Sequence, residues 1–430
     1  MNIFIFSRST IKHFISGGME THLDNLANGL ISLGHEITII TTSYPTSDKF
    51  IEKETKIINE NGIKYVYIGE TTPGLNPVSK IEKFFLTVKI LKRNKNNLEG
   101  KLNYFKESSL FFKNEIQKGS FCDVIISQST AGQGLSTNLD IPIVSIIHGT
   151  IINEIKNRLK SNRSAKNWIR FIFVDLPRWY YELITSNRKF FKRVNIIVAV
   201  SNILKRNFVS QSIGINKNEL KYKTKVIYNG VDSKRFKPGN KKYPKFTLLY
   251  VGRMDREKGI DLIIKAVSIL KQKTNDININ VKLIGGGDYL EELKDQATKA
   301  GINDLVEFCG QVNNSDLPKY YQMSHVFVLP TRREEGHPMT VSEAYLCGLP
   351  VIGTNMGGLS EVIKDKVTGY FINKDDAKDL AEKLDHIIKS PEVLTKMSKN
   401  AHEYSKLNFS QNSMSKSYEK LLKSLIHGKK

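Results

Sequence analysis

The 430-residue sequence has no apolar run of the roughly 18 residues that a membrane-spanning helix requires. Its opening stretch, MNIFIFSRST, has no basic region before its apolar residues and is too short for a secretory signal peptide. We interpret this stretch as a first β-strand. The expectation is a cytoplasmic protein that could also work at the inner face of the cell membrane.

Cysteine is scarce as well. The three cysteines, Cys122, Cys309 and Cys347, lie far apart and show no metal-ligand spacing. This usage suits a reducing compartment, in which each cysteine serves as a small buried hydrophobic residue. We therefore predict neither a disulfide framework nor a metal site.

The composition is that of a globular chain, with 40% hydrophobic and 25% charged residues. A single core does not usually extend over 430 residues, so two or three domains are expected. The net charge of +22 is uneven, because residues 1–240 have 36 Lys and Arg against 19 Asp and Glu, while residues 241–430 have 29 against 24. The basic first half indicates an anionic partner, unless it only reflects a composition rich in Lys, Asn and Ile.

Short apolar runs alternate with helix-periodic stretches along the whole chain. In the first half, NIFIFS, HEITIITT, CDVIISQS, PIVSIIHGT and VNIIVAVS read as buried strands, and in the second half KFTLLYV, INVKLIG, LVEFCG, HVFVLP and PVIGT do so. Such alternation predicts an α/β fold with doubly wound parallel sheets. The breaker-rich segment 226–245 is the candidate linker between two Rossmann-like domains facing a central cleft.

Domain boundaries follow from this linker. We predict an acceptor-side domain over residues 1–230, a donor-binding domain over 231–405, and one C-terminal amphipathic helix over 406–430 that packs back on the first domain. Two basic, aromatic-rich stretches of the first domain, 80–119 and 153–193, have helical periodicity. The aromatic residues of the second stretch either meet a membrane or pack between helices. These residues are Trp168, Phe171, Trp179 and Tyr180, interleaved with Arg170, Arg178 and Arg188.

Glycine-rich turns follow several of the predicted strands. Gly17 and Gly18 precede the first helix, and Gly285 begins a Gly-Gly-Gly turn in the second domain. Glycine allows the backbone to approach a phosphate closely, and a helix N-terminus attracts it. The spacing is not Gly-x-Gly-x-x-Gly, which disfavours a dinucleotide-dependent dehydrogenase. Arg253 and Lys258 share one strand-end loop, where two cations can neutralise a diphosphate without a metal.

Two glutamates mark the segment TRREEGHPMTVSE. Glu335 lies in the loop that leaves the strand HVFVLP, and Glu343 lies about one turn inside the helix predicted to begin near Met339. Carboxylates in these positions suit a ligand rich in hydroxyl groups, such as a sugar or a ribose. The simpler alternative is that both only complement the helix dipole.

This order of motifs resembles the retaining GT-B glycosyltransferases of glycosyltransferase family 4, the glycosyl transferases group 1 type. The resemblance covers nearly the whole chain and is weakest across residues 75–120 and 150–195. The matching motifs are GGMETH, IIHGT, VIYNGVDSKRF, GRMDREKG, LIGGGD, the E-x7-E pattern of EEGHPMTVSE, and NMGGLSEVI.

The resemblance implies roles for individual residues. Arg253 and Lys258 would bind the donor diphosphate, Glu335 the donor sugar, Glu343 the ribose, and His148 would lie near the transferred sugar. Glu361 would orient the diphosphate loop. The other donor-binding positions are Gly17, Gly18, Gly252, Gly285, Gly336, His337, Pro338, Met339 and Thr340. His337 and Pro338 stand where many members have Phe-Gly, which leaves the donor sugar open.

The function implied is retaining transfer of a hexosyl group from a nucleotide-sugar to a glycan or lipid-linked acceptor in cell-surface polysaccharide synthesis. A UDP-sugar is expected in preference to a GDP-sugar, as a substrate and with no cofactor. No Asp-x-Asp motif occurs, so a metal-independent reaction by front-face attack is expected. Peripheral contact with an anionic membrane through the first domain is a further expectation, and nucleic acid is not expected to bind. The alternatives are a sugar-nucleotide 2-epimerase of the same architecture and a non-catalytic protein that binds an anionic polymer.

Overall fold

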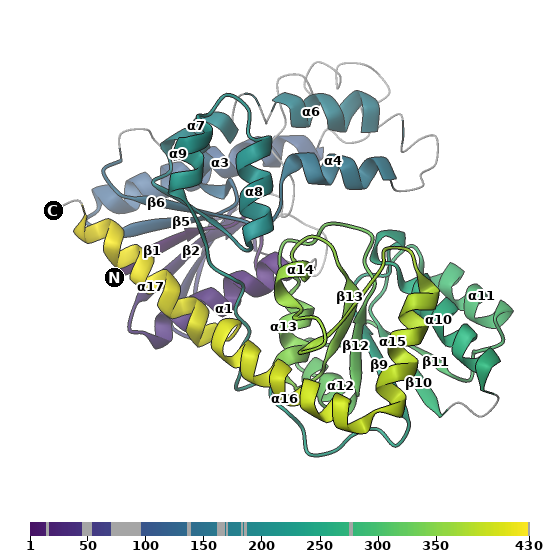
Figure 1. The fold of residues 1–430 in the computed structure, drawn as a ribbon. Coiled ribbons are helices and arrows are strands. Elements are labelled where there is room, and N and C mark those ends of the chain that lie inside the picture. The colour runs from purple at the N-terminus through teal and green to yellow at the C-terminus, as the bar shows by residue number, and fades with distance from the viewer. Residues whose placement is uncertain are drawn as a thin grey trace. The chain divides into compact units, whose positions relative to one another are not determined.

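The computed structural model describes residues 1–13, 17–44, 54–69, 96–135, 139–160, 168, 171–181, 184, 187–274 and 278–428. The chain forms two compact units (Figure 1). The first comprises Met1–Ile227 together with Met414–Lys430, and the second comprises Tyr228–Ser413. Each unit has its own sheet and its own hydrophobic core.

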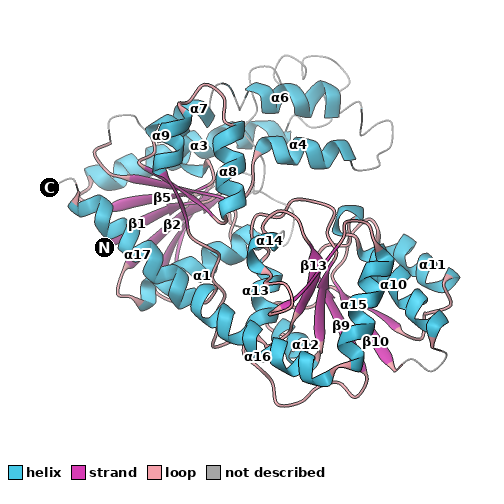
Figure 2. Ribbon diagram, in the orientation of Figure 1, coloured by secondary structure: helices cyan, strands magenta, loops and turns pink. Residues whose placement is uncertain are grey.

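The first unit alternates strands and helices in the order expected for a doubly wound sheet (Figure 2). Its strands are β1 (Asn2–Phe6), β2 (Glu36–Thr42), β3 (Lys56–Glu60), β4 (Ile63–Ile68), β5 (Val124–Gln128), β6 (Ile143–Ile147), β7 (Ile196–Ala199) and β8 (Thr224–Val226). Its helices are α1 (Gly18–Ser32), α3 (Asn96–Gln117), η2 (Ala131–Gly134), α4 (Ile151–Lys160), η3 (Phe171–Asp175), α6 (Leu176–Tyr181), α7 (Asn187–Arg193), α8 (Asn202–Gln211), α9 (Lys217–Lys223) and the C-terminal α17 (Gln411–His427).

The sheet of the first unit has the order β3-β4-β2-β1-β5-β6-β7-β8. All neighbouring strands are parallel except β3 and β4, which form an antiparallel hairpin at one edge. The hairpin turn is Asn61-Gly62, and both residues have positive φ, 50° and 78°. Such a turn matches the twist of the two strands and is a recognisable sequence signal that the strand pattern above leaves out.

The second unit repeats the architecture with six strands. They are β9 (Phe246–Val251), β10 (Ile279–Ile284), β11 (Val306–Gly310), β12 (Val326–Leu329), β13 (Val351–Thr354) and β14 (Gly369–Ile372). The helices are η5 (Arg256–Lys258), α10 (Ile260–Lys273), α11 (Leu290–Lys299), α12 (Leu317–Met323), α13 (Met339–Leu346), α14 (Leu359–Val362), α15 (Ala377–Lys389) and α16 (Pro391–Asn408). The all-parallel order β11-β10-β9-β12-β13-β14 is that of a dinucleotide-binding Rossmann sheet.

Strands at the centre of both sheets are buried on both faces. Every residue of β5, β6, β12 and β13 is buried, which explains why their sequences are continuous apolar runs and not alternating ones. The prediction of an α/β fold with two doubly wound parallel sheets is confirmed.

The C-terminal segment differs from the prediction of one continuous helix. The chain breaks between α16 and α17 at Phe409 and Ser410, where Ser410 forms a parallel bridge with Val231. Phe409 is 1% exposed and packs its ring against Tyr228 and His337. Burial of this ring and two backbone hydrogen bonds to Val231 stabilise the break.

Helix α17 then contributes to the core of the first unit. Met414, Tyr418 and Leu422 are spaced at four-residue intervals on one face of the helix and are buried in that core. The last residues of the chain therefore belong with the first strands.

The aromatic side chains that follow α4 include both buried and exposed ones. Phe171 and Trp179 are buried and meet edge to face, with ring centroids 6.0 Å apart, whereas Tyr180 is 67% exposed. Packing between helices is thus correct for two of these rings. Arg170 lies outside the described residues. No helix within the described ranges is long and apolar enough to cross a membrane.

Candidate functional site

The candidate site of the second unit lies where the strand order reverses. The loops after β9 and β12 leave adjacent parallel strands at the same sheet edge, and in sheets of this topology that switch point is where ligands bind. The loop after β9 includes Gly252, Arg253 and Lys258, and the loop after β12 includes Glu335. The fold therefore brings together residues that are more than 70 positions apart in the sequence.

An ion pair joins these two loops. The Lys258 Nζ lies 2.7 Å from the Glu335 Oε1, and the two side chains are only 17% and 13% exposed. Burial opposes ionisation of Glu335, but Lys258 and Arg333 outweigh it, and the pKa of the carboxyl lies below its ordinary value. Glu335 is therefore ionised at neutral pH and paired with a cation.

Arg332 fixes the geometry of the loop that bears Glu335. Its Nη1 and Nη2 donate to the two oxygens of Asp261 at 2.6 and 2.9 Å, and its Nη1 also donates to the carbonyl of Arg256 at 2.8 Å. The Arg332 backbone N–H donates to the carbonyl of Glu257 at 2.8 Å. The bidentate contact fastens the loop after β12 to the start of α10, and the two contacts to carbonyl groups fasten it to η5, the short helix that ends with Lys258.

Arg253 differs from Lys258 in its exposure. Its side chain is 69% exposed and lies 3.2 Å from Asp255, while its carbonyl accepts a 2.8 Å hydrogen bond from the buried Tyr250 hydroxyl. The hydrogen bond from Tyr250 thus fixes the backbone of the loop, and the Arg253 side chain is largely exposed to solvent.

A glycine is required where the loops after β9 and β10 touch. Gly285 has φ of +130°, and a Cβ at this position would lie 1.9 Å from the carbonyl oxygen of Gly252. The hydrogen bonds from Gly252 N to Ile284 O and from Met254 N to Gly286 O hold the loops together. The Gly-Gly-Gly turn therefore has a structural reason besides any approach to a phosphate.

The Gly-Gly turn before α14 packs directly on the loop after β12. Gly358 donates its N–H to the Glu335 carbonyl at 2.7 Å, and a Cβ on Gly358 would lie 1.9 Å from the carbonyl oxygen of Gly336. Glu361 follows on α14 and accepts a 3.0 Å hydrogen bond from the Tyr228 hydroxyl. This tightly packed turn supports the backbone of Glu335.

Glu343 lies in the interior of the second unit. It is 6% exposed, and its Oε2 accepts a 2.7 Å hydrogen bond from Tyr321, which is completely buried. Burial raises the pKa of Glu343, and the Tyr321 hydrogen bond opposes that rise. The carboxylate thus has a protein partner at one oxygen, and a ribose assigned to it would bind beside Tyr321.

His337 has protein partners at both ring nitrogens. The backbone N–H of Asn229 donates to its Nδ1 at 3.0 Å, and its Nε2 lies 2.9 Å from the Ser342 hydroxyl. An imidazole that accepts at Nδ1 is protonated at Nε2, and burial lowers its pKa to about 3. The neutral ring therefore stabilises the backbone at Asn229 and the start of α13 through its two nitrogens. Neither nitrogen is left for a hydrogen bond to a donor sugar.

The three residues that follow His337 form the start of α13. Pro338 is the N-cap of the helix, Met339 is 6% exposed, and Thr340 is half-buried. The expected helix start at Met339 is confirmed.

The glycine turn of the first unit is occupied by a side chain. The Gly17 N–H donates to the Glu20 Oε2 at 2.8 Å, and the other Glu20 oxygen accepts from the Ser9 hydroxyl. Gly17 is the N-cap and Gly18 the first residue of α1. An anion that used the Gly17 amide would have to displace the Glu20 carboxylate.

His148 belongs to a chain of three side chains in the first unit. Its Nε2 lies 2.9 Å from the Gln128 Oε1, and the Gln128 Nε2 lies 3.4 Å from the His22 Nδ1. A glutamine Oε1 only accepts, so His148 bears its proton on Nε2 and its Nδ1 is an acceptor. Burial lowers the pKa of His148 to about 4, which keeps the ring neutral at pH 7.

The residues that position the site were not predicted from the sequence. Arg332, Asp261, Tyr321 and Gln128 were given no role, although the Arg-Arg pair directly after a buried strand was a usable signal. Among the described side chains, no group of three or more His, Cys, Asp or Glu residues is placed to hold a metal ion.

Comparison with known proteins agrees with this geometry. The sequence model of Glycosyltransferase Family 4 matches residues 16–235, and that of Glycosyl transferases group 1 matches residues 231–404. The chain belongs to glycosyltransferase family 4. An uncharacterised glycosyltransferase of Methanocaldococcus jannaschii is 25% identical over 391 residues, which cover 87% of this chain and 86% of that one.

Solved structures show that this family 4 chain has the GT-B fold. Sucrose-phosphate synthase from Thermosynechococcus elongatus superposes with a TM-score of 0.72 at 19% identity, covering 99% of both chains. HepE of Anabaena in complex with UDP gives a TM-score of 0.65 at 17% identity, covering 99% of this chain and 100% of that one. The fold predicted from the motifs is confirmed, and the transferase class of the enzyme follows from the family.

His337 should make the free energy of unfolding of this family 4 protein decrease as the pH falls. The unfolded histidine binds a proton near pH 6.5, whereas the native ring stays neutral until about 3, so the unfolded state binds more protons in between. The free energy of unfolding should then fall as the pH falls from 6.5, by up to about 1.4 kcal/mol per pH unit from this group. We expect His337→Phe to reduce that slope in urea unfolding between pH 7 and pH 4.

Burial lowers the pKa values of His148 and His325 to about 4, so these two residues should account for the pH dependence of the free energy of unfolding that remains in His337→Phe. His337→Phe should also lower stability at pH 7 by about 1–3 kcal/mol, because the Asn229 N–H loses its acceptor. The same substitution at the exposed His386 on α15 is the control. An unchanged slope in His337→Phe would show that the native ring is not held neutral.

Proposed function

We propose that this glycosyltransferase transfers a hexosyl group from a nucleotide-sugar, with retention, to a glycan or lipid-linked acceptor. The observation on which the proposal rests is the partly buried Lys258–Glu335 pair at the switch point of the second sheet, with Arg253 exposed on the same loop. A diphosphate needs cations and a sugar needs hydrogen-bond acceptors. Here a cation, the Lys258 Nζ, lies 2.7 Å from an acceptor, the Glu335 Oε1. The HepE structures hold UDP and UDP-glucose, which supports a UDP-sugar as donor.

The chemistry required is stabilisation of the leaving nucleotide. Cleavage of the bond between the sugar and the diphosphate leaves negative charge on the phosphate oxygens, and preorganised cations lower the energy of that state. Arg253 and Lys258 are the groups proposed for this task. Glu335, held ionised by Lys258, would accept hydrogen bonds from the sugar hydroxyls.

Retention is proposed to proceed by front-face attack, in which the acceptor oxygen attacks from the side of the leaving phosphate. No enzyme nucleophile is then required. His148 is neutral, because its pKa is about 4, so it would contribute hydrogen bonding and not positive charge near the sugar. The roles of Gly336, Glu343 and Glu361 in donor binding remain part of the same proposal.

Replacement of Arg253 tests the donor site. We expect Arg253→Ala to reduce sugar transfer from UDP-glucose by ~10²-fold or more, because a positioned charge on the leaving group is lost. Its side chain is 69% exposed, so the fold should persist. Arg256→Ala is the matched control, since Arg256 is 50% exposed in the same loop and pairs with Glu292. Near-normal transfer by Arg253→Ala would reject the assignment, and an epimerised nucleotide-sugar formed without acceptor would indicate the 2-epimerase.

Chelation tests the metal-independent part of the proposal. The two cations of the loop after β9 can take the place of a divalent ion at the diphosphate, so transfer should continue at an unchanged rate after dialysis against EDTA. The measurement is the initial rate of nucleotide release before and after chelation. Loss of the rate in EDTA, with recovery on addition of Mg²⁺ or Mn²⁺, would show that a metal is needed.

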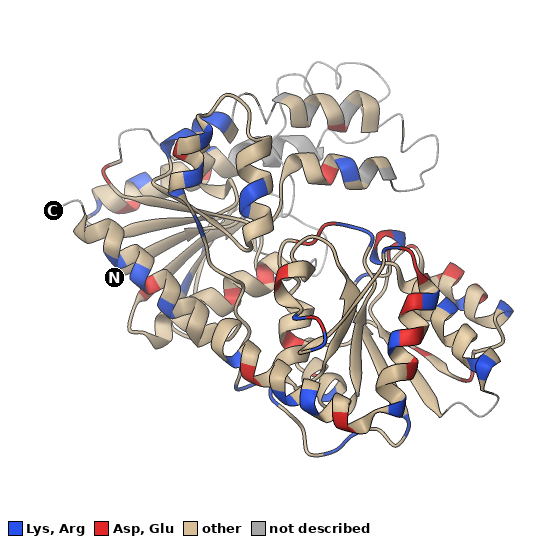
Figure 3. Cartoon of the chain, in the orientation of Figure 1, with Lys and Arg blue, Asp and Glu red and all other residues tan. Residues whose placement is uncertain are grey.

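Peripheral contact with an anionic membrane is proposed for the first unit. Basic residues predominate on α7, α8 and α9 in Figure 3, whereas α15 of the second unit has both acidic and basic residues. Phe173 and Tyr180 are 57% and 67% exposed on η3 and α6. Basic charge attracts an anionic leaflet, and aromatic rings favour the interface. A lipid-linked acceptor in cell-surface polysaccharide synthesis, met at the inner face of the membrane, would account for both.

Co-sedimentation with vesicles tests this contact. We expect binding to vesicles that contain phosphatidylserine, weaker binding at high salt, and little binding to pure phosphatidylcholine. Replacing Phe173 and Tyr180 with Ser should reduce binding, as should Ser at Arg170, Arg178 and Arg188. The control is Ile57→Ser, since Ile57 is a 49% exposed apolar residue on β3. No binding to the anionic vesicles at low salt would favour an acceptor in free solution.

A further inference from the structure

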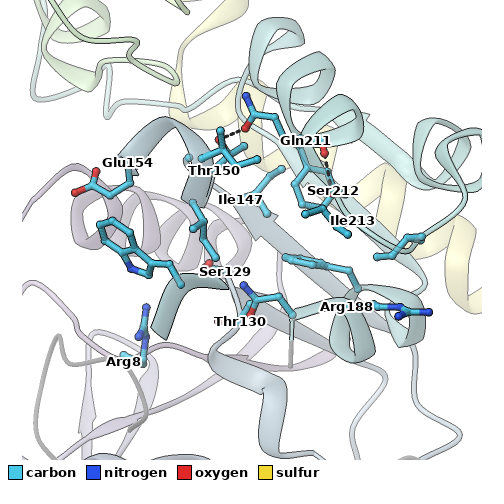
Figure 4. A pocket seen from close by; sticks show the side chains of 18 residues that line it. Arg8, Ser129, Thr130, Ile147, Thr150, Glu154, Arg188, Gln211, Ser212 and Ile213 are labelled. Atoms are coloured by element: carbon cyan, nitrogen blue, oxygen red, sulfur yellow. Dashed lines mark hydrogen bonds between the residues drawn. The ribbon is translucent and has the colours of Figure 1, made fainter. Parts of the chain in front are cut away.

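A pocket in the first unit has polar groups that are already paired within the chain. It encloses about 410 Å³ at the carboxyl ends of β5 and β6 (Figure 4). Of the residues that line it, Thr150 donates its hydroxyl to the Gln211 Oε1 at 2.6 Å, and the Ser129 N–H donates to β6 at 2.7 Å. Arg8 and Glu154 have interactions of their own. The opposite situation, a buried polar group without a partner, is rare in folded proteins and points to a place that another state completes.

Arg333, in the loop after β12, has such a group. Within the part of the chain that the structure describes, its buried Nε makes no hydrogen bond. This Nε lies 3.7 Å from the Glu335 Oε1, and the Arg333 Nη1 lies 3.6 Å from the Glu257 Oε2. Both distances allow Coulombic attraction but are too long for a hydrogen bond. The side chain is 23% exposed, so little water reaches it.

The Glu335 carboxylate is held at the oxygen that lies nearest to Arg333. Its Oε1 accepts from the Lys258 Nζ at 2.7 Å and from the Thr331 hydroxyl at 3.4 Å. Arg333 Nε approaches the same oxygen. A displacement of this oxygen by about 1 Å toward Arg333 would therefore bring it to hydrogen-bond distance of the Nε.

Lys258 has two anions to serve once a donor binds. In the function proposed above it neutralises the diphosphate, whereas in the structure it pairs with Glu335, whose side chain is 13% exposed. A poorly solvated carboxylate that loses its cation tends to take up a proton. Protonation would remove the charge that strengthens its hydrogen bonds to sugar hydroxyls.

The other groups that face Glu335 supply one candidate for a second cation. Tyr250 of β9 stays neutral, because burial and then the charge of Glu335 raise its pKa well above the ordinary value. Thr331 is neutral, and Glu257 is itself an anion beside Arg333. The guanidinium of Arg333 is therefore the group that can replace Lys258.

We propose that Arg333 is a positioning residue that keeps Glu335 ionised while Lys258 turns to the donor diphosphate. The Lys258 Nζ then moves from the Glu335 Oε1 to a phosphate oxygen, and that Oε1 accepts the Nε–H of Arg333 in its place. No proton is transferred and no covalent bond changes. The proposal rests on the donor site proposed above and adds to it a residue outside the E-x7-E pattern.

Proton uptake on donor binding tests this role without requiring turnover. UDP-glucose is titrated calorimetrically into the full chain in two buffers of different ionisation enthalpy, and the difference in heat gives the number of protons bound. We expect Arg333→Gln to take up about half a proton or more per donor in excess of the wild-type chain near pH 5.5, because Glu335 loses its remaining cation.

Two further variants are the controls for this titration. Arg333→Lys retains the positive charge and should remove most of the excess. Arg256→Gln removes a 50% exposed cation from the loop after β9 and should match the wild-type chain. If Arg333→Gln does not fold, Arg333→Met, which keeps an apolar stem of similar length, repeats the measurement.

The pH dependence of sugar transfer separates the two states of Glu335. The profile of kcat reports on the donor complex, and that of kcat/KM reports on the free enzyme. In Arg333→Gln we expect the acid limb of kcat to move up by about 1 pH unit. The acid limb of kcat/KM should move less, because Lys258 still pairs with Glu335 in the free enzyme. A residue that only supports the loop would lower the rate without moving either limb.

The outcomes distinguish this role from the proposed function. Equal proton uptake by the wild-type chain and Arg333→Gln, or an unmoved acid limb of kcat, would overturn the role of Arg333 and leave the transferase proposal standing. Excess uptake by Arg333→Gln, with neither hydrolysis nor transfer by the wild-type chain, would refute the transferase proposal instead. A wild-type chain that does not bind UDP-glucose would refute the proposed donor and this inference with it.

Discussion

Parallel strands that run side by side must all end at the same edge of a sheet, and the chemistry of this molecule depends on that constraint. In both units the strand order reverses beside the first strand, so the loops from either side of the reversal diverge and leave room for side chains between them. In the second unit the Lys258–Glu335 pair spans the space between the loops after β9 and β12. In the first unit the same edge bears Ser129, His148 and the pocket. Each site is thus a consequence of topology before it is a consequence of particular residues.

Several ionisable side chains in the interiors of the two units are either paired with an opposite charge or held neutral. Glu335 remains ionised because Lys258 and Arg333 outweigh the effect of burial, whereas His337 and His148 remain neutral because burial lowers the pKa of each ring. A neutral imidazole can accept at one nitrogen and donate at the other, which is how His337 bonds both the Asn229 backbone N–H and the Ser342 hydroxyl. Such networks specify one arrangement of loops, because any displacement leaves a buried group without its partner.

The apolar runs of the sequence predicted the parallel sheets because strands buried on both faces have no reason to alternate. Only part of the candidate site could be predicted from the sequence. Arg253, Lys258 and Glu335 could be selected because charged residues in the loops that leave buried parallel strands lie near the sheet edge. Their partners are set by tertiary contacts that no local pattern encodes. The pairing of Arg332 with Asp261 spans 71 positions, and that of Tyr321 with Glu343 depends on how α12 meets α13. The break at Phe409 was missed for the same reason, because helical periodicity continues through it while the ring packs against Tyr228 and His337.

The bridge between Val231 and Ser410 joins the beginning and the end of the second unit. That unit is therefore a closed insertion whose two connections leave from one place, and the first unit is a discontinuous domain that needs both ends of the chain. During synthesis on the ribosome, every residue of the second unit emerges before Tyr418 and Leu422 become available to the core of the first. The order of completion is thus opposite to the order of the chain: the second unit can close while the first still lacks its last helix. Until then the apolar surface that Met414, Tyr418 and Leu422 cover in the finished first unit is open to water, where transiently exposed apolar surface favours aggregation.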